Sequence, residues 1–215
     1  VVEPGHPDAP YPVVRTFVAN LDEYPFPTGG PVAATETNFD RVSVEAARGA
    51  VGWERQTAHG RAQVLYYLAE NLDAQSERLV ACLAALSGTA EARREVQASV
   101  QALFSAAAWC DKFEGAVHQP PMHGVTLALH EAIGVLGLVA TPQAPLLGLV
   151  SLIAPAIAMG NRVVAVPSST LPLIAAELYA VLDTSDVPAG VVNLVTGDAD
   201  ALADVLAAHA DVDAL

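Results

Sequence analysis

The sequence predicts an α/β fold: a doubly wound parallel sheet with a region of helices ahead of it. Residues 133–215 alternate between short apolar runs and stretches with helical spacing, which is typical of strand–helix–strand units. Residues 38–113 carry apolar side chains at three- and four-residue steps, which indicates consecutive helices. Residues 1–35 contain seven prolines, which exclude a long helix and favour an extended arm.

Composition places the chain among globular proteins of one large domain or two small ones. Of its 215 residues, 53% are hydrophobic and 16% are charged, and a chain of this size can bury roughly 70% of its extended surface. Twenty-four acidic and ten basic residues give a net charge of −14, and Lys112 is the only lysine. Nucleic acid and membrane surfaces are therefore poor partners, because both are bound through clustered Lys and Arg.

No segment has the pattern of a signal peptide or a membrane helix. The longest apolar stretch, residues 133–159, is interrupted by three prolines and a glutamine. A spanning helix needs about 20 apolar residues without such breaks. The two cysteines lack Cys-x-x-Cys spacing and fit buried, reduced thiols. We therefore expect a cytoplasmic protein.

The chain ahead of the sheet divides into three parts. Residues 1–35 form the Pro-rich arm, with one short strand at Val13–Val18, and residues 36–123 form the helical region. Residues 124–132 hold an alternating, half-exposed strand over Gly124–Glu131. The expected helices run from Asn38 to a stop at Gly52, over Thr57–Leu86 and over Ala90–Phe113.

Residues 133–215 form the parallel core. The expected elements are, in order, a strand over Ile133–Ala140, a helix over Leu146–Met159, a strand over Arg162–Val166, a helix capped by Ser168 that runs to Asp183, a strand over Val191–Val195, a helix over Asp198–Ala208 and a strand that begins at Val212. The last strand has no following helix to cover it. We therefore expect either a truncated product or one piece of a larger protein.

Three loops follow the core strands, at residues 140–145, 166–169 and 195–199. Open parallel sheets bind ligands outside the carboxyl ends of their strands, and the helix that starts after each loop favours an anion such as a pyrophosphate. The alternative is that these are ordinary strand-to-helix loops, rich in Pro, Ser and Gly because turns require them. Spacing alone leaves both interpretations open.

Ordered motifs along the chain resemble the aldehyde dehydrogenase superfamily. They are I-G-V-L-G-L-V-A-T-P, I-A-P-A-I-A-M-G-N-R-V-V, D-V-P-A-G-V-V-N-L-V-T-G and H-A-D-V-D in residues 133–215, with W-E-R-Q-T-A-H-G-R-A-Q-V-L-Y-Y-L-A-E-N-L upstream. The resemblance implies a Rossmann-like sheet, an NAD(P) cofactor and an oligomerisation-type strand at residues 124–132. The segments V-L-D-T-S-D-V-P-A-G and A-A-W-C-D-K-F-E-G-A-V-H-Q-P-P look most like the degenerate C-terminal module of tandem (family-sixteen-type) members, which lacks the catalytic cysteine.

The resemblance assigns a degenerate cofactor-binding set, namely Thr141, Pro142, Gln143, Val166, Pro167, Ser169 and Gly197. The family has Trp-Asn where this chain has Gln143 and Ala144, and loss of that asparagine as an oxyanion donor costs on the order of 10²–10³ in rate. Val166 and Ser169 replace the lysine and glutamate that hold the adenosine ribose, and Ala199 replaces a glycine. NAD(P) binding is expected to be weak or absent, and the choice between NAD and NADP stays open.

No catalytic residue is assigned. In the family, the catalytic cysteine and the general-base glutamate come from sequence beyond the last residue of this chain. Cys82 and Cys110 lie upstream of the core strands and are expected to be structural. Other candidates are expected to be structural or solvated: the histidines His118, His123, His130 and His209, and the carboxylate pairs Asp198/Asp200 and Asp211/Asp213. No metal is expected.

Three functions from different classes remain open. The favoured one is a non-catalytic structural or dimerisation module, partnered by a second copy or by a catalytic aldehyde dehydrogenase module. The second is the cofactor domain of an active NAD(P)-dependent aldehyde dehydrogenase. The third is an unrelated small-ligand binder that uses the same crevice.

Overall fold

The computed structural model describes residues 17–18, 44–113, 115–121 and 123–215, and it confirms the expected α/β fold. Four parallel strands form one sheet in the order β1-β6-β5-β4, with β1 at Phe17–Val18, β4 at Val135–Val139, β5 at Arg162–Val166 and β6 at Val192–Val195. A parallel bridge joins Leu136 to Ala214 on the other side of β4. The strand order therefore reverses next to β4, which is where doubly wound sheets bind their ligands.

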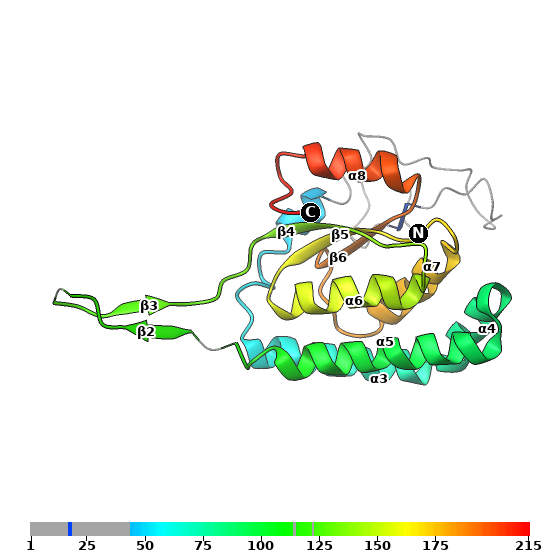
Figure 1. Ribbon diagram of the computed structural model, residues 1–215, viewed down its shortest axis with the longest axis horizontal. Coiled ribbons are helices and arrows are strands. Elements are labelled where there is room, and N and C mark those ends of the chain that lie inside the picture. The colour runs from blue at the N-terminus through cyan, green and yellow to red at the C-terminus, as the bar shows by residue number, and fades with distance from the viewer. Residues whose placement is uncertain (1–16, 19–43, 114, 122) are drawn as a thin grey trace, which may run out of the picture.

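Helices cover both faces of this sheet (Figure 1). α6 (Pro145–Ala158) and α7 (Leu173–Asp183) lie on one face, and α8 (Ala199–Ala208) and α2 (Glu45–Gly49) lie on the other. A further layer, made of α3 (Ala58–Ala74), α4 (Ser76–Ser87) and α5 (Thr89–Trp109), packs on α6 and α7. Because α6 and β5 are covered from both sides, both are apolar along nearly their whole length.

Two apolar cores hold these layers together. The larger lies between the sheet, α6, α7 and the outer helices, and its fully buried side chains include Trp53, Leu65, Leu72, Leu149 and Ile157. The smaller lies between the sheet, α2 and α8, and includes Val44, Val164, Val166 and Leu206. The Trp53 indole donates a hydrogen bond to the Ile157 carbonyl (2.9 Å), which satisfies its polar group within the larger core.

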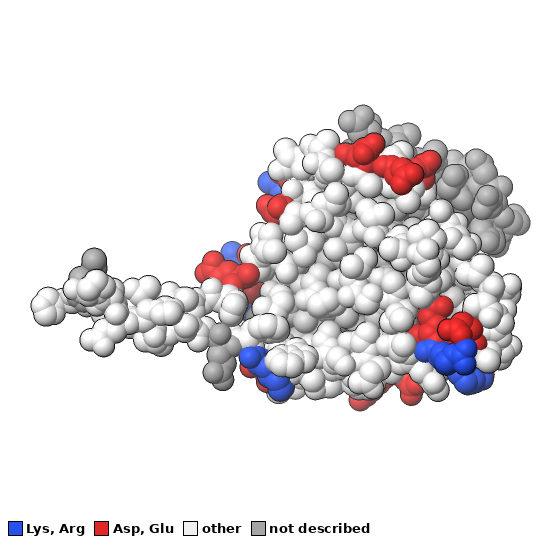
Figure 2. Space-filling view, in the orientation of Figure 1, with Lys and Arg blue, Asp and Glu red and all other residues white. Residues whose placement is uncertain are grey.

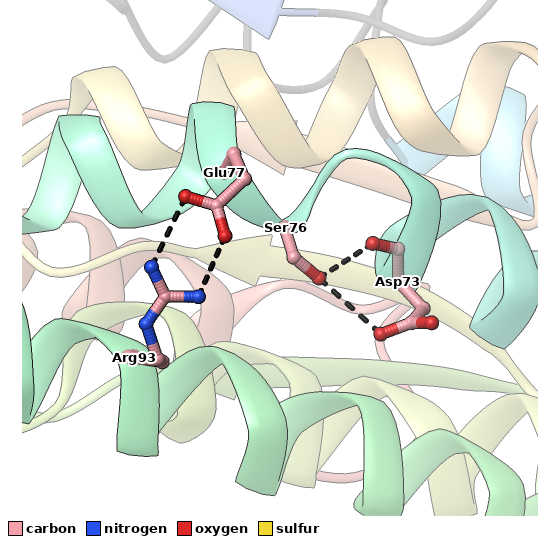
Figure 3. Close-up of polar contacts among 4 residues, drawn as sticks. All are labelled: Asp73, Ser76, Glu77 and Arg93. Carbon is pink, nitrogen blue, oxygen red and sulfur yellow. Dashed lines mark hydrogen bonds and ion pairs between the residues drawn. The ribbon is translucent and has the colours of Figure 1, made fainter.

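The helix expected over Thr57–Leu86 is in fact two helices, α3 and α4, which meet at Gln75. The Ser76 hydroxyl donates to the Asp73 carbonyl oxygen (2.5 Å) and lies 3.3 Å from the Asp73 carboxylate, as Figure 3 shows. Such side-chain bonds compete with the helical backbone ladder and so favour a turn. Across from this turn, Glu77 pairs through two hydrogen bonds with Arg93 of α5.

Several other boundaries also differ from the expectation. α7 begins at Leu173, because Ser168 accepts a hydrogen bond from the Thr170 amide (3.1 Å) in a local turn and therefore does not cap the helix. α5 ends at Trp109, four residues before the expected Phe113. The helix expected from Asn38 is described only as α2, because residues 38–43 lie outside the described part.

The strand expected over Gly124–Glu131 forms half of a hairpin that projects from the body (Figure 1). β3 (Thr126–Ala128) pairs antiparallel with β2 (Ala116–His118), which was not expected. Both strands are exposed throughout, so the expectation of a half-buried strand was wrong. Apolar and polar residues do alternate along this strand, but its apolar side chains Val125, Leu127 and Leu129 remain exposed. Of the Pro-rich arm, only Phe17–Val18 is described, as β1.

Polar contacts fix the end of the sheet opposite the three loops. The Asn161 side-chain oxygen accepts from the amides of Ile133 (2.7 Å) and Gly134 (3.1 Å). The Asp213 carboxylate accepts from the Val135 amide (2.8 Å), and its own amide donates back to the Val135 carbonyl (2.8 Å). The Asn161 contacts fix the start of β4, and the Asp213 contacts hold the segment after α8 against β4, on the side away from β5.

Substitution of Gly190 by alanine should destabilise the fold by more than about 2 kcal/mol, because strain and overpacking add there. Gly190 has φ +83°, and a Cβ would overlap the carbonyl oxygen of Ala46 in the first turn of α2. Gly88 has φ +80° with no atom within 4 Å of the added Cβ. With its ψ of 155°, Gly88 has a conformation that only glycine readily adopts, so Gly88→Ala reports backbone strain alone, about 1–3 kcal/mol. Urea unfolding measures both, and a loss well below about 2 kcal/mol in Gly190→Ala would contradict the described contact between α2 and the turn before β6.

Candidate functional site

The candidate crevice lies at the carboxyl ends of β4, β5 and β6, where the three loops start. The backbone of Ala140 donates to the Val166 carbonyl (2.9 Å), so the first two loops are adjacent. Thr141, Pro142, Gln143 and Ser169 are exposed, and Gly197 is half-buried. These residues form the accessible part of the predicted set.

Two members of the predicted set are not accessible. Val166 has no exposed surface, because its side chain belongs to the smaller core, and Pro167 is also buried. A ribose at the mouth of the crevice therefore does not meet the Val166 side chain in this conformation. The structure brings the three loops to one edge, but it leaves only their outer residues available to a ligand.

The N-terminus of α6 is capped by a carboxylate from another helix. Glu95 of α5 accepts hydrogen bonds from the backbone amides of Leu146 (2.8 Å) and Leu147 (3.2 Å). Pro145 has no amide hydrogen, and the Gly148 amide donates to the Ala144 carbonyl (2.6 Å). The amides of Leu146 and Leu147, which normally remain free at a helix start, thus have an acceptor within the chain.

The other two helices at this edge show the same pattern. At α8, the Asp198 carboxylate accepts from the amides of Asp200 (3.0 Å) and Ala201 (3.1 Å), so it caps the helix. At α7, the amides of Ile174 and Ala175 donate to the carbonyls of Leu171 and Pro172, both at 3.1 Å. Two amides at the start of each helix, which could otherwise favour a bound anion, are therefore bonded to groups of the chain itself.

Charge at the crevice is negative or absent. The three loops contain no Lys, Arg or His, and acidic side chains gather over α8, as Figure 2 shows. The nearby Asp200 adds a second carboxylate in the first turn of α8. A negative potential at this edge opposes a pyrophosphate or a 2′-phosphate.

Ala144 has an unusual backbone conformation at the start of α6. Its φ of 50° and ψ of 68° lie in the left-handed region, where Asn and Gly are favoured and alanine is strained. It is also the position at which the resemblance expects an asparagine. The loop therefore has a backbone suited to asparagine while carrying a residue without an amide.

Neither cysteine lies at the crevice. Cys110 is buried at the end of α5, and its thiol donates to the Ala106 carbonyl (3.5 Å). Burial raises the pKa of Cys110 to about 11. Burial also raises the pKa of Cys82 on α4, and the carboxylate of Glu177 adds to this rise. Both thiols therefore remain protonated at neutral pH, which makes them poor nucleophiles.

The remaining titratable candidates have local contacts in the described structure. His130 lies edge-on to Phe113, with ring centroids 6.1 Å apart, and His209 accepts from the Asp211 amide (3.1 Å). Asp211 pairs with Arg48 (2.9 Å), and Asp213 holds β4 as described above. Among the described residues, no three His, Cys, Asp or Glu side chains are grouped to hold a metal ion.

Sequence reasoning missed the contact that Glu95 makes with the start of α6. The residue was visible only as one acidic position on the inner part of a helix, between Ala92, Val96 and Ser99, which are buried too. An acidic residue at a position with core spacing is the signal that could have drawn attention, because buried carboxylates are rare without a partner. Its partner lies 51 residues further along the chain and is a backbone group, which no side-chain pattern indicates.

Comparisons with known proteins agree with the fold. The sequence model of the aldehyde dehydrogenase family matches residues 28–215. An aldehyde dehydrogenase from Agaricus bisporus is 32% identical over 186 residues, which cover 84% of this chain and 37% of the relative.

Two solved structures are similar as well. An NAD-dependent aldehyde dehydrogenase from Sinorhizobium meliloti is 28% identical with a TM-score of 0.79, covering 85% of this chain and 37% of that one. A glyceraldehyde-3-phosphate dehydrogenase from Methanocaldococcus jannaschii, solved with NADP, is 27% identical with a TM-score of 0.76, covering 84% and 41%. This chain thus spans less than half the length of each of these proteins.

No helix in the described part is long and apolar enough to cross a membrane.

Substitution of Ala144 by glycine should raise the free energy of unfolding by about 0.5–1 kcal/mol, because the relief of left-handed strain exceeds the added chain entropy. Ala201 is exposed within α8, so Ala201→Gly should lower stability by a similar amount. Thermal and urea unfolding of both variants test the difference in sign. A destabilised Ala144→Gly variant would show that the loop does not keep this conformation in solution.

Cys110 should alkylate slowly in the folded protein. A rise in pKa from 9.0 to about 11 lowers the thiolate fraction at pH 8 by about a hundredfold, and labelling should accelerate as the pH rises toward the raised value. Iodoacetamide labelling followed by mass spectrometry, in native buffer and in urea, measures this ratio. Equal rates in the two conditions would mean that Cys110 is an accessible, reactive thiol.

Proposed function

The chain belongs to the aldehyde dehydrogenase family, and from this premise we propose that it is a non-catalytic aldehyde dehydrogenase-like domain. Its role is that of a structural or dimerisation module of an NAD-dependent aldehyde oxidoreductase in the cytoplasm. The chain carries the family's fold, whereas the groups for cofactor binding and chemistry are degenerate or absent in it. The proposal concerns this chain alone, since it spans less than half of the relatives it matches.

The observation that carries the proposal is the use of the crevice amides within the chain. Glu95 occupies the start of α6 and Asp198 the start of α8. A dinucleotide that approached either helix would have to displace a carboxylate that is covalently part of the protein. Its phosphates would also meet negative charge without a compensating Lys or Arg in the loops.

The replaced side chains act in the same direction. Val166 and Ser169 stand where the resemblance expects a lysine and a glutamate, and a lost charged hydrogen bond is worth about 1.5–3 kcal/mol. Gln143 and Ala144 replace the pair that contains the oxyanion donor. Together with the protonated thiols of Cys82 and Cys110, these changes leave no described group suited to attack an aldehyde.

A finer assignment follows from two segments. Residues 107–121 and 181–190 resemble the degenerate C-terminal module of tandem family members. In that arrangement a catalytic module accompanies the degenerate one. The proposed partner is therefore either a second copy of this chain or a catalytic aldehyde dehydrogenase module.

The projecting hairpin is the proposed contact surface. Its apolar side chains Val117, Val125, Leu127 and Leu129 are 60–74% exposed. Val117 and Leu127 are cross-strand partners, so they lie on the same face of the hairpin. An exposed apolar strand of this kind is typical of an interface, where it pairs with or packs on another chain.

The second candidate function is the cofactor domain of an active NAD(P)-dependent aldehyde dehydrogenase. It is favoured by two similar structures, one of an NAD-dependent aldehyde dehydrogenase and one of a glyceraldehyde-3-phosphate dehydrogenase complexed with NADP. Under this alternative, the crevice binds a dinucleotide despite its replacements, and the aldehyde is oxidised by residues supplied elsewhere. Dinucleotide affinity separates the two proposals.

Calorimetric titration with NAD should show no saturable heat at micromolar concentrations, because the crevice lacks both cations and available helix amides. The Sinorhizobium meliloti enzyme serves as the positive control under the same conditions. Saturable binding in the low micromolar range would contradict the non-catalytic proposal. If heat is seen, Gly197→Asp identifies its source, since it should abolish binding at the crevice and leave binding elsewhere intact.

Sedimentation velocity should detect a self-associated species that Val117→Asp and Leu127→Asp disrupt, because each substitution places a charge on the apolar face of the hairpin. Thr126→Asp alters the opposite face of the same strand and is the matched control. If the wild-type chain is monomeric at every concentration, self-association is excluded. The catalytic module then remains as the proposed partner, and a failure to bind it as well would overturn the interface role.

A further inference from the structure

We propose that Glu95 is a positioning residue: its carboxylate, carried by α5 in the outer layer, sets the backbone conformation of the Thr141–Ala144 loop at the crevice. The inference rests on the proposed function only in that it treats this loop as part of the crevice. In this role, α5, which lies outside the sheet, controls the conformation of a loop at the crevice. Neither the cofactor nor a partner is needed for this role.

The contact is specific and buried. Glu95 is 7% exposed, and one oxygen of its carboxylate accepts from two successive amides, those of Leu146 and Leu147. Leu146 itself has no exposed surface, so water does not reach this point readily. Hydrogen bonds from amides to an ionised acceptor are stronger than bonds between neutral groups, and a helix start favours negative charge.

No local group can replace this acceptor. The residue at the N-cap position of α6 is Ala144, which has no side-chain oxygen, and α6 has no side-chain cap bond of its own. The first helical residue is Pro145, which cannot donate. Removal of the Glu95 carboxylate would therefore leave two amides without an acceptor, and one of them is buried.

The conformation of the loop depends on the same contact. The left-handed conformation of Ala144 is unfavourable for alanine, so another interaction must hold it. The Ala144 carbonyl accepts from the Gly148 amide inside the helix, while the Thr141 hydroxyl donates to the Gln143 carbonyl (3.3 Å). Glu95 fixes the first turn of α6, and the strained Ala144 connects this turn to the loop. Residues 141–143 then lie at the surface.

The carboxylate has no competing role in the described structure that would explain its burial. The Ser99 hydroxyl donates to the Glu95 backbone carbonyl (2.8 Å), which is a contact within α5 and leaves the carboxylate free for α6. The Glu95 carboxyl group thus adds a polar contact between α5 and α6 to the apolar contacts of their buried side chains.

The test is amide exchange measured by nuclear magnetic resonance on the full chain without nucleotide. In Glu95→Ala, the Leu146 and Leu147 amides should exchange at least roughly tenfold faster relative to Val164 in the central strand, and the signals of Thr141–Ala144 should shift. Glu95→Gln keeps an acceptor oxygen without charge, so it should be intermediate. Formate should restore protection in Glu95→Ala by refilling the vacated site, whereas neutral formamide should not.

Glu91→Ala is the matched control, because Glu91 is exposed one turn earlier on the same helix and pairs with Arg94. It should leave the loop signals unchanged. Unchanged Leu146 and Leu147 exchange in Glu95→Gln and Glu95→Ala would overturn the proposal, as would a failure of formate to act. If Glu95→Ala does not fold, Glu95→Gln decides on the same readings. Since no NAD or partner is present, the result is independent of the outcome for the proposed function.

Discussion

The hydrogen bonds from the start of α6 to Glu95 are the contact on which the crevice depends. They join the outer helical layer to the helix that follows the first core strand, at the edge where doubly wound sheets bind ligands. A helix that begins with proline after an alanine has no means of capping itself. The carboxylate supplies that cap, and the strained conformation of Ala144 persists because the first turn is held in place.

The residues that hold the scaffold together are largely distinct from the exposed residues of the three loops. The sheet, its two apolar cores and the polar contacts of Asn161 and Asp213 involve none of the exposed loop residues. Val166 stands where the resemblance expects a ribose-binding lysine, and its side chain is part of the smaller core. The exposed residues of the three loops can therefore change without loss of the fold.

The sequence was sufficient for the parallel core, because its buried strands and turn residues are local signals. Arg162–Val166 was expected as a strand and is one, with every residue buried. The break at Gln75 was missed, since the apolar spacing continues through it and only the contacts of Ser76 with Asp73 reveal the turn. The hairpin was half predicted, because a three-residue strand beside two prolines carries little pattern.

The position of the three loops could be predicted from the sequence, but the contacts of their residues could not. Parallel strands place the three loops at one edge, whatever their side chains are. Packing between segments far apart in the chain decides whether Val166 faces a ligand or the core. It also decides whether the amides at a helix start have an acceptor, as with Glu95 and Leu146. The most direct measurement is a crystal structure of the chain grown with millimolar NAD. The account predicts no ordered dinucleotide over the three loops and an intact contact from Glu95 to α6, whereas a dinucleotide seated between Ser169 and Gly197 would contradict it.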